Sequence, residues 1–155
     1  MRMSDNLGDT ILLPAAEHTK AKHRILSDYL NGWLPIIGQT SGRMIYLDGM
    51  AGSGEYDDGS FGSPILAVDA AHNHFLKARI SCETIFLFVE IHQGRFKHLE
   101  ELLEKKYGKW DPTTETYAGL SSKYKFEWLC AASTANMGEP KLPSSYSPEP
   151  AMPSR

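Results

Sequence analysis

The sequence has only two cysteines, Cys82 and Cys130, and their spacing fits neither a metal site nor a disulfide framework. It also lacks an apolar run at its N-terminus and any apolar stretch of membrane-spanning length. These absences argue against a secretory signal, a membrane partner and a bound metal. We therefore expect a protein of the reducing cytoplasm.

An excess of charge of one sign is also lacking. The formal net charge is -3 at pH 7, which offers no strong attraction to nucleic acid or to an anionic membrane. Lys20, Lys22, His23 and Arg24 nevertheless gather in one short stretch. This stretch is either a solvated surface or a basic rim beside a phosphate. A nucleic-acid partner therefore stays open, although the net charge does not support it.

Histidines at positions 72 and 74 form the string "HNH", the name of a nuclease motif. That motif is a spread-out ββα metal site and not a literal tripeptide. We therefore interpret His72 and His74 as surface residues of a helix.

With 155 residues, 41% of them hydrophobic and 23% charged, the chain suits one globular domain. Residues 17–39 are predicted to form a helix that Gly32 and Pro35 loosen near its end. Apolar residues at three- and four-residue steps predict one buried stripe, namely Ile25, Leu26, Tyr29, Leu30, Trp33, Leu34 and Ile37.

Three apolar runs, 44–47, 84–91 and 124–131, predict strands, and the near-continuous run 44–47 is typical of a parallel strand that is buried on both faces. Helical patterns over 64–78 and 94–109 separate them, and residues 111–122 are rich in turn formers. The order β-α-β-α-β predicts an α/β fold with the first half of a Rossmann-like sheet. We expect a flexible segment 1–16, a partial domain 17–131 and a disordered Pro/Ser-rich tail 132–155.

A glycine-rich loop, Asp48-Gly49-Met50-Ala51-Gly52-Ser53-Gly54, follows the first predicted strand. In open α/β sheets, ligands bind at this carboxyl edge. Glycine can adopt positive φ and lets the backbone approach a ligand closely. The next helix is delayed until Ser63 and Pro64, which resemble an N-cap and a first helical residue.

Glu90 ends the second predicted strand, where an acid in a Rossmann-type unit accepts hydrogen bonds from ribose hydroxyls. Its separation from Asp48 exceeds the roughly 20 residues of a compact unit. The long loop 55–62 accounts for much of the difference. A structural alternative stays open, because a glycine turn and a helix-capping acid need no ligand.

Three nucleotide sites can be compared for this loop. A P-loop needs a closing Gly-Lys-Ser/Thr, and no lysine occurs between Arg43 and Lys77. A dinucleotide loop would place a pyrophosphate beside the acids at 55, 57 and 58, which would repel it. S-adenosylmethionine carries no phosphate and tolerates these acids. The predicted cofactor-binding residues are Asp48, Gly49, Met50, Ala51, Gly52, Gly54 and Glu90, and no catalytic residue is identified.

Three segments carry a family resemblance: "TKAKHRILSDYLNGWLPI" (19–36), "YLDGMAGSGEYDDGSFGSPILAV" (46–68) and "FLFVEIHQGRFKHLEELL" (86–103). The loop resembles motif I of class I S-adenosylmethionine-dependent methyltransferases, with Met50 where phenylalanine is usual. The three segments together resemble the three-Cys-motif partner (TcmP) proteins. The resemblance implies a methyltransferase-like fold, S-adenosylmethionine binding through Asp48, the loop glycines and Glu90, and a cysteine-motif protein as partner.

The resemblance covers about the first two-thirds of the chain. Family members continue with a D-P-[FP]-G-like segment on a fourth strand, and Asp111-Pro112 does not match it because no fourth strand precedes it. We therefore expect a C-terminally truncated protein that is inactive alone. The alternative is a non-catalytic cofactor-binding or protein-interaction module that acts with a partner protein.

Overall fold

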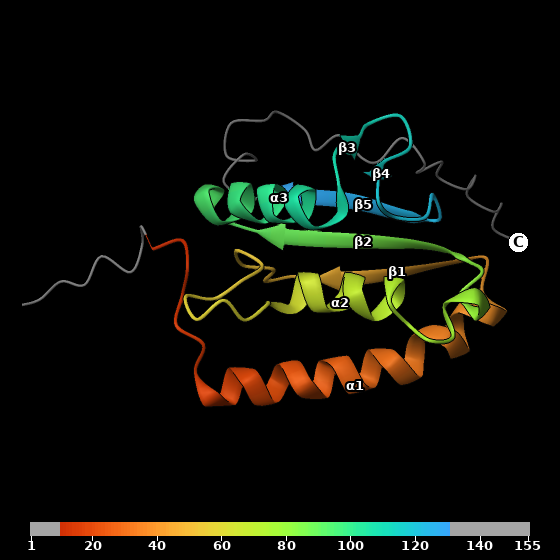
Figure 1. Cartoon of the computed structure of the whole chain (residues 1–155), viewed down its shortest axis with the longest axis horizontal. Helices are drawn as coiled ribbons and strands as arrows, with labels where there is room; N and C mark the ends of the chain where they lie inside the picture. The colour runs from red at the N-terminus through yellow and green to blue at the C-terminus, as the bar shows by residue number, and fades with distance from the viewer. Residues whose placement is uncertain (1–9, 131–155) are drawn as a thin grey trace, which may run out of the picture.

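A three-stranded parallel sheet organises residues 10–130, which are the residues that the computed structural model describes. Strands β1 (Arg43–Asp48), β2 (Glu83–Glu90) and β5 (Tyr124–Cys130) lie in the order β1-β2-β5. Their carboxyl ends therefore meet at one edge (Figure 1). This arrangement confirms the predicted α/β class and the three predicted strands. The predicted tail 132–155 and the segment 1–9 lie outside the described residues.

Only one face of the sheet carries a well-buried core. Phe86 and Phe88 of β2 are almost fully buried, as are Tyr124 and Phe126 of the neighbouring strand. On the opposite face Ile45 is 56% exposed, Leu47 60% and Leu129 50%. The prediction that the first strand, 44–47, is buried on both faces is therefore wrong.

Connection handedness explains this asymmetry. Both crossovers, β1 to β2 and β2 to β5, advance across the sheet in the same direction. Because parallel crossovers are right-handed, the two helices that make them must lie on the same face. Figure 1 shows α2 (Ser63–His72) and α3 (Gln93–Tyr107) in front of the strands.

The first helix, α1 (Glu17–Thr40), confirms the predicted range but not its predicted break. Pro35 is buried inside the helix, which continues to Thr40. Leu30, Leu34 and Gly38 form the buried side, and α1 packs mainly against α2. Two of the seven residues of the predicted stripe, Ile25 and Tyr29, are exposed instead of buried. A single helix neighbour covers only one side of α1.

Helix α2 begins at Ser63, with Gly62 as its cap, and ends six residues before the predicted end, at His72. Phe75, expected on the buried side, is 87% exposed. His74 is buried instead of lying on the surface: its Nε2 is 2.8 Å from the Asn31 carbonyl oxygen, and its Nδ1 accepts from Leu76 N–H at 2.8 Å. Through these two contacts His74 joins α1 to the turn before the short helix η1 (Lys77–Arg79).

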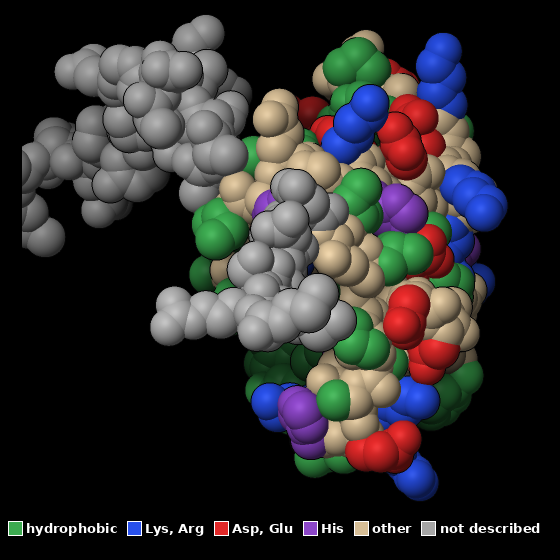
Figure 2. Space-filling view, turned by 90° about the vertical axis from the view of Figure 1, so that its left-hand side faces the viewer, with side chains coloured by type: hydrophobic (Ala, Val, Ile, Leu, Met, Phe, Trp, Pro, Cys, Tyr) green, Lys and Arg blue, Asp and Glu red, His purple; other side chains and the backbone are tan. Residues whose placement is uncertain are grey.

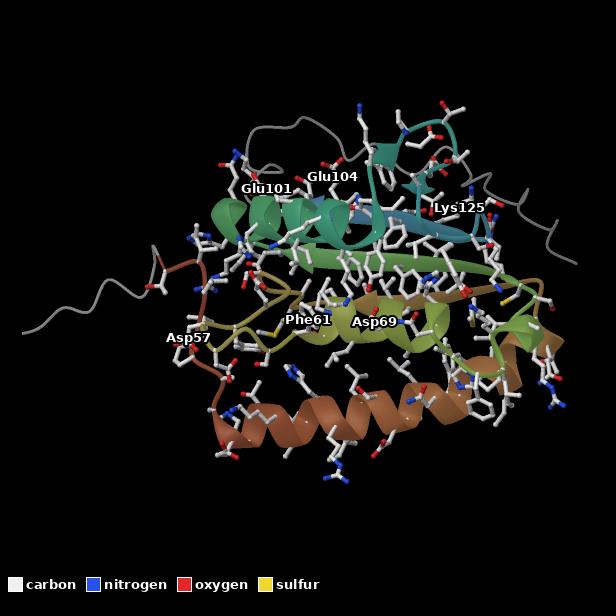
Figure 3. The ribbon with its side chains drawn as sticks, in the orientation of Figure 1. Asp57, Phe61, Asp69, Glu101, Glu104 and Lys125 are labelled. Atoms are coloured by element: carbon white, nitrogen blue, oxygen red, sulfur yellow. The ribbon has the colours of Figure 1, made fainter. Side chains whose placement is uncertain are left out.

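Helix α3 confirms the predicted buried residues Leu99, Leu102, Leu103 and Tyr107, and it ends at Gly108, whose φ is 88°. Asp69 of α2 binds α3 through both carboxylate oxygens. Its Oδ1 accepts from the Tyr107 hydroxyl at 2.8 Å, and its Oδ2 lies 3.1 Å from Lys106 Nζ. The same ammonium lies 4.2 Å from the ring centre of Phe61 (Figure 3). These contacts join the two helices over the buried face.

The turn-rich stretch contains a hairpin that the sequence did not predict, formed by β3 (Trp110–Asp111) and β4 (Thr116–Tyr117). The Glu115 carbonyl of this hairpin accepts from Phe126 N–H, so the hairpin borders β5. Among the described strands, β1 pairs with β2 alone. None of the helices within residues 10–130 is long and apolar enough to cross a membrane.

Candidate functional site

A cavity of about 280 Å³ lies at the carboxyl ends of β1 and β2. Its volume is near the lower end of the roughly 300–1,000 Å³ of small-ligand pockets. Six of the seven predicted site residues line it: Gly49, Met50, Ala51, Gly52, Gly54 and Glu90. The fold therefore brings a loop and an acid from separate strands into one place.

Glu90 is 7% exposed and fastens the glycine loop to the sheet. Its Oε2 accepts from Gly52 N–H at 2.8 Å, and its Oε1 accepts from His92 N–H at 2.7 Å. A carboxylate offers about four lone-pair positions. Two therefore stay available for hydroxyl donors in the cavity.

Asp48, the seventh predicted residue, does not line the cavity. Its Oδ1 accepts from Met50 N–H at 3.1 Å, and its Oδ2 accepts from the Ser63 hydroxyl at 2.5 Å. Asp48 thus joins the end of β1, the glycine loop and the first residue of α2. We interpret it as a positioning residue.

Two glycines of the loop adopt positive φ, Gly52 at 68° and Gly54 at 81°. A Cβ at Gly54 would lie 2.6 Å from Leu99 Cδ1, so this glycine is required by packing against α3. A Cβ at Gly52 or Gly49 would meet nothing within 4 Å. The glycines therefore serve two purposes: Gly54 faces the core, and the other two leave space on the open side.

The acids that follow the loop lie in different places. Glu55 lines the cavity and pairs with His98, whose Nε2 is 2.9 Å from its Oε1. Asp57 and Asp58 are exposed on the loop. Hydrogen bonds from the Ser60 hydroxyl and N–H, and then from Lys20, lower the pKa of Asp58 to about 2. Only one of the three acids is therefore placed to repel a phosphate in the cavity.

Sequence patterns did not indicate several lining residues, among them Arg95, Tyr56 and Leu13. Arg95 lies in the first turn of α3 and donates from Nε and Nη2 to the Thr10 carbonyl at 3.2 and 3.1 Å. Asp57 N–H donates to the Leu13 carbonyl at 3.1 Å. Residues 10–16 thus run beside the cavity. No periodicity could reveal contacts that a coil segment makes across the fold.

The basic N-terminal part of α1 contacts the long loop 55–62. Lys20 Nζ lies 3.1 Å from Asp58 Oδ2, and the His23 ring centre lies 5.5 Å from that of Tyr56. Burial lowers the pKa of His23, while Asp48 raises it less. Lys20 and His23 therefore support the long loop 55–62, a contact that the charge pattern of the sequence does not indicate.

Figure 2 views the molecule toward the carboxyl ends of the strands. Charged side chains of both signs are interspersed there with hydrophobic ones. Within the cavity lining itself, Glu55 and Glu90 accompany one cation, Arg95. Among the described residues, a single cation beside two carboxylates does not make a lining suited to a polyphosphate.

Comparisons with family models, with curated proteins and with solved structures find no match for this chain.

Proposed function

We propose that the cavity at the carboxyl ends of β1 and β2 binds S-adenosylmethionine. The chain is then a methyltransferase-like protein of the three-Cys-motif partner type, with a Rossmann-like fold. The observation that carries the proposal is the Glu90 carboxylate, which lines the same cavity as the glycine loop and hydrogen-bonds to Gly52 N–H. The strand order and the same-side crossovers agree with the first half of a doubly wound sheet.

The lining fits the chemical groups of this cofactor. The two free acceptor positions of Glu90 match a pair of ribose hydroxyls. Ile91 and Met50 offer apolar surface for a base, and Gly49 and Gly52 leave space beside the backbone. When bound, S-adenosylmethionine supplies an electrophilic methyl group on a sulfonium. The proposal assigns cofactor-binding residues and no catalytic residue.

Isothermal titration of the full chain with S-adenosylmethionine and S-adenosylhomocysteine tests the proposal. We expect both to bind and Glu90→Gln to weaken binding about 10- to 100-fold, because hydrogen bonds to a charged acceptor are lost. Asp48→Asn is the matched control: it also loosens the loop, but it lies outside the cavity. We expect it to weaken binding less.

Three outcomes would oppose this proposal. A chain that is folded by circular dichroism yet gives no titration signal with either compound would remove the cofactor assignment. Equal losses from Glu90→Gln and Asp48→Asn would mean that Glu90 acts only by holding the loop. Displacement of the cofactor by ATP or NAD would favour a phosphate-bearing ligand instead.

The bare sheet face favours a second candidate, a protein-interaction module. Ile45 and Leu47 are apolar and more than half exposed, and they lie on β1, whose other edge pairs with no described strand. Such an edge accepts an added strand from another polypeptide. The occupant that fits is a segment of a protein partner, which the family resemblance would make the cysteine-motif protein.

Hydrogen exchange and light scattering test this second candidate. Co-purified cysteine-motif protein should protect β1 amides from exchange, and Leu47→Lys should remove that protection. A dimer of the isolated chain, broken by Leu47→Lys, would show instead that a second copy covers the face. A monomer with unchanged β1 exchange in the presence of the partner would argue against this candidate.

A further inference from the structure

A second cavity, of about 340 Å³, lies between α3, the β3–β4 hairpin and β5. It shares no lining residue with the candidate cofactor site. Helix α3 forms its acidic wall with Glu100, Glu101 and Glu104, which share one helix face with Lys97. Figure 3 shows Glu101 and Glu104 along the upper side of α3, the side on which β3 and β4 lie.

The negative charge of this wall is only partly compensated. Lys97 Nζ lies 3.8 Å from Glu101 Oε1, and both side chains are mostly exposed. Trp110 N–H donates to Glu104 Oε1 at 3.1 Å. Within residues 10–130 no cation forms an ion pair with Glu100. Burial raises the pKa of Glu100, and Glu104 and Glu101 raise it further.

The other walls are aromatic, which is an observation independent of the carboxylates. Trp110, Tyr117 and Trp128 come from three different strands and all line the cavity. The Trp110 and Tyr117 rings meet edge to face with centres 5.1 Å apart, and Phe96 holds Trp128 in the same way at 5.8 Å. Both indoles are only half-buried. Two large rings are therefore fixed in place while part of their surface stays open.

We propose that this cavity binds an organic cation of the alkylammonium class. Indole faces attract an ammonium through the ring quadrupole, most strongly when the cation is partly desolvated. The carboxylates of α3 add a field of the matching sign, and ligand binding relieves their mutual repulsion. A metal ion fits less well, because within the described residues no three His, Cys, Asp or Glu side chains are placed to hold one metal ion. The inference does not depend on the cofactor proposal.

Tryptophan fluorescence of the full chain can report directly on this cavity. The chain has three tryptophans, and Trp33→Phe leaves only Trp110 and Trp128, both in the lining. In that background we would titrate tetramethylammonium and butylammonium chlorides at constant ionic strength. Sodium chloride and 3,3-dimethylbutanol, a neutral compound of similar shape to a quaternary ammonium, are the controls. We expect a saturable change with the ammonium salts alone.

Two variants test whether the fluorescence change comes from a cation bound beside the acidic wall of α3. Glu100→Gln should weaken the binding of the ammonium about 2- to 30-fold, the range of one lost electrostatic or cation–π contact. Glu17→Gln on exposed α1 should leave it unchanged. If Nα-acetyl-lysine methylamide also saturates the signal, the natural ligand is a polypeptide side chain. If the quaternary ion alone does so, the ligand is a methylated ammonium.

Three results would contradict the proposed binding of an alkylammonium ion. The absence of a saturable response to every cation, in a chain that is folded by circular dichroism, would overturn the proposal. A response to 3,3-dimethylbutanol equal to that of tetramethylammonium would reduce the cavity to an apolar cleft. If the Glu100→Gln variant binds the ammonium ions with unchanged affinity, the acidic wall does not contribute to their recognition.

Discussion

Both faces of the sheet carry apolar side chains, but the two faces have opposite surroundings. On one face Phe86 and Phe88 are covered by α2 and α3, and the ring centre of Phe126 lies within 6.4 Å of those of five other aromatic rings. On the other, Ile45, Leu47 and Leu129 are at least half exposed. Neighbouring apolar residues of one strand, such as Met44 and Ile45 of β1, therefore differ strongly in burial, because alternate side chains point to opposite faces.

The comparison teaches that hydrophobicity marks a strand without saying which face is covered. Coverage depends on the direction of the crossovers, because right-handed connections that advance the same way place every helix on one side. A bare apolar face of this kind is typical of an interaction surface. Substitutions on the two faces should therefore have very different costs.

The largest effect is expected from Phe88→Ala on the covered face. The side chain is fully buried among aromatic rings, so its removal leaves a cavity and should cost about 3–5 kcal/mol of unfolding free energy. Leu129→Ala, on the bare face, should cost less than about 1 kcal/mol. Urea denaturation measures both. Equal costs would show that the bare face is covered in solution.

Gly54→Ala tests the packing of the glycine loop against α3, on the covered face of the sheet. Its φ is 81°, and the new Cβ would lie 2.6 Å from Leu99 Cδ1. We expect a loss of about 1–3 kcal/mol from strained backbone, together with displacement of Leu99. Gly49→Ala is the control, since its Cβ meets nothing within 4 Å. Thermal unfolding that is the same for both variants would contradict the packing role of Gly54.

Glu100→Gln tests the edge of the covered face, where α3 lies beside the β3–β4 hairpin. The folded protein raises the pKa of Glu100 above 4.5, chiefly by burial, so the ionised carboxylate destabilises the fold. This destabilisation is absent at pH values below the pKa of Glu100 in the unfolded chain. It is complete at pH values above the pKa of Glu100 in the folded protein. Glu100→Gln should therefore stabilise the chain at neutral pH, by less than about 1 kcal/mol, because the group is only partly buried and solvent screens its interactions.

Urea denaturation at several pH values measures this effect. The advantage of Glu100→Gln should shrink as the pH falls through the titration range of the carboxylate. An advantage that grows at acidic pH would reverse the assigned direction of the pKa shift. Glu17→Gln, on the exposed start of α1, supplies the baseline.

The smallest effect on stability is expected from Leu47→Lys on the bare face. A lysine can extend into solvent from this exposed position, so the free energy of unfolding should change by about 0.5 kcal/mol or less. Met44→Lys, on the covered side of the same strand, should cost several times more because it buries a charge. Loss of folding in Leu47→Lys would mean that β1 is covered on both faces.

Much of the fold could be predicted from local sequence. The apolar runs indicated the three strands, and the three- and four-residue spacing indicated α1 and α3. Local rules failed where distant residues decide. The end of α2 at His72 depends on His74, whose ring joins α1 through Asn31. The β3–β4 hairpin forms along β5 and has no strand pattern of its own.

The candidate site was predicted in its main parts and missed in its surroundings. The glycine loop and Glu90 were both indicated by position after a strand, and the sheet brings them together. Arg95, Tyr56 and Leu13 carry no local signal, because they reach the cavity from α3, the long loop and a coil segment. Asp48 shows the reverse case: the pattern marked it for a ligand, and its oxygens hold Met50 and Ser63.

By itself, the sequence determined the three strands of the main sheet and the helices α1 and α3, and it marked the glycine loop and Glu90, because periodicity and glycine placement act locally. Only the tertiary structure decided that one face of the sheet stays bare, that Glu90 closes onto the loop, and that three aromatic rings meet an acidic helix face. These features arise from crossover handedness and from contacts between residues far apart in the chain, which no local pattern encodes.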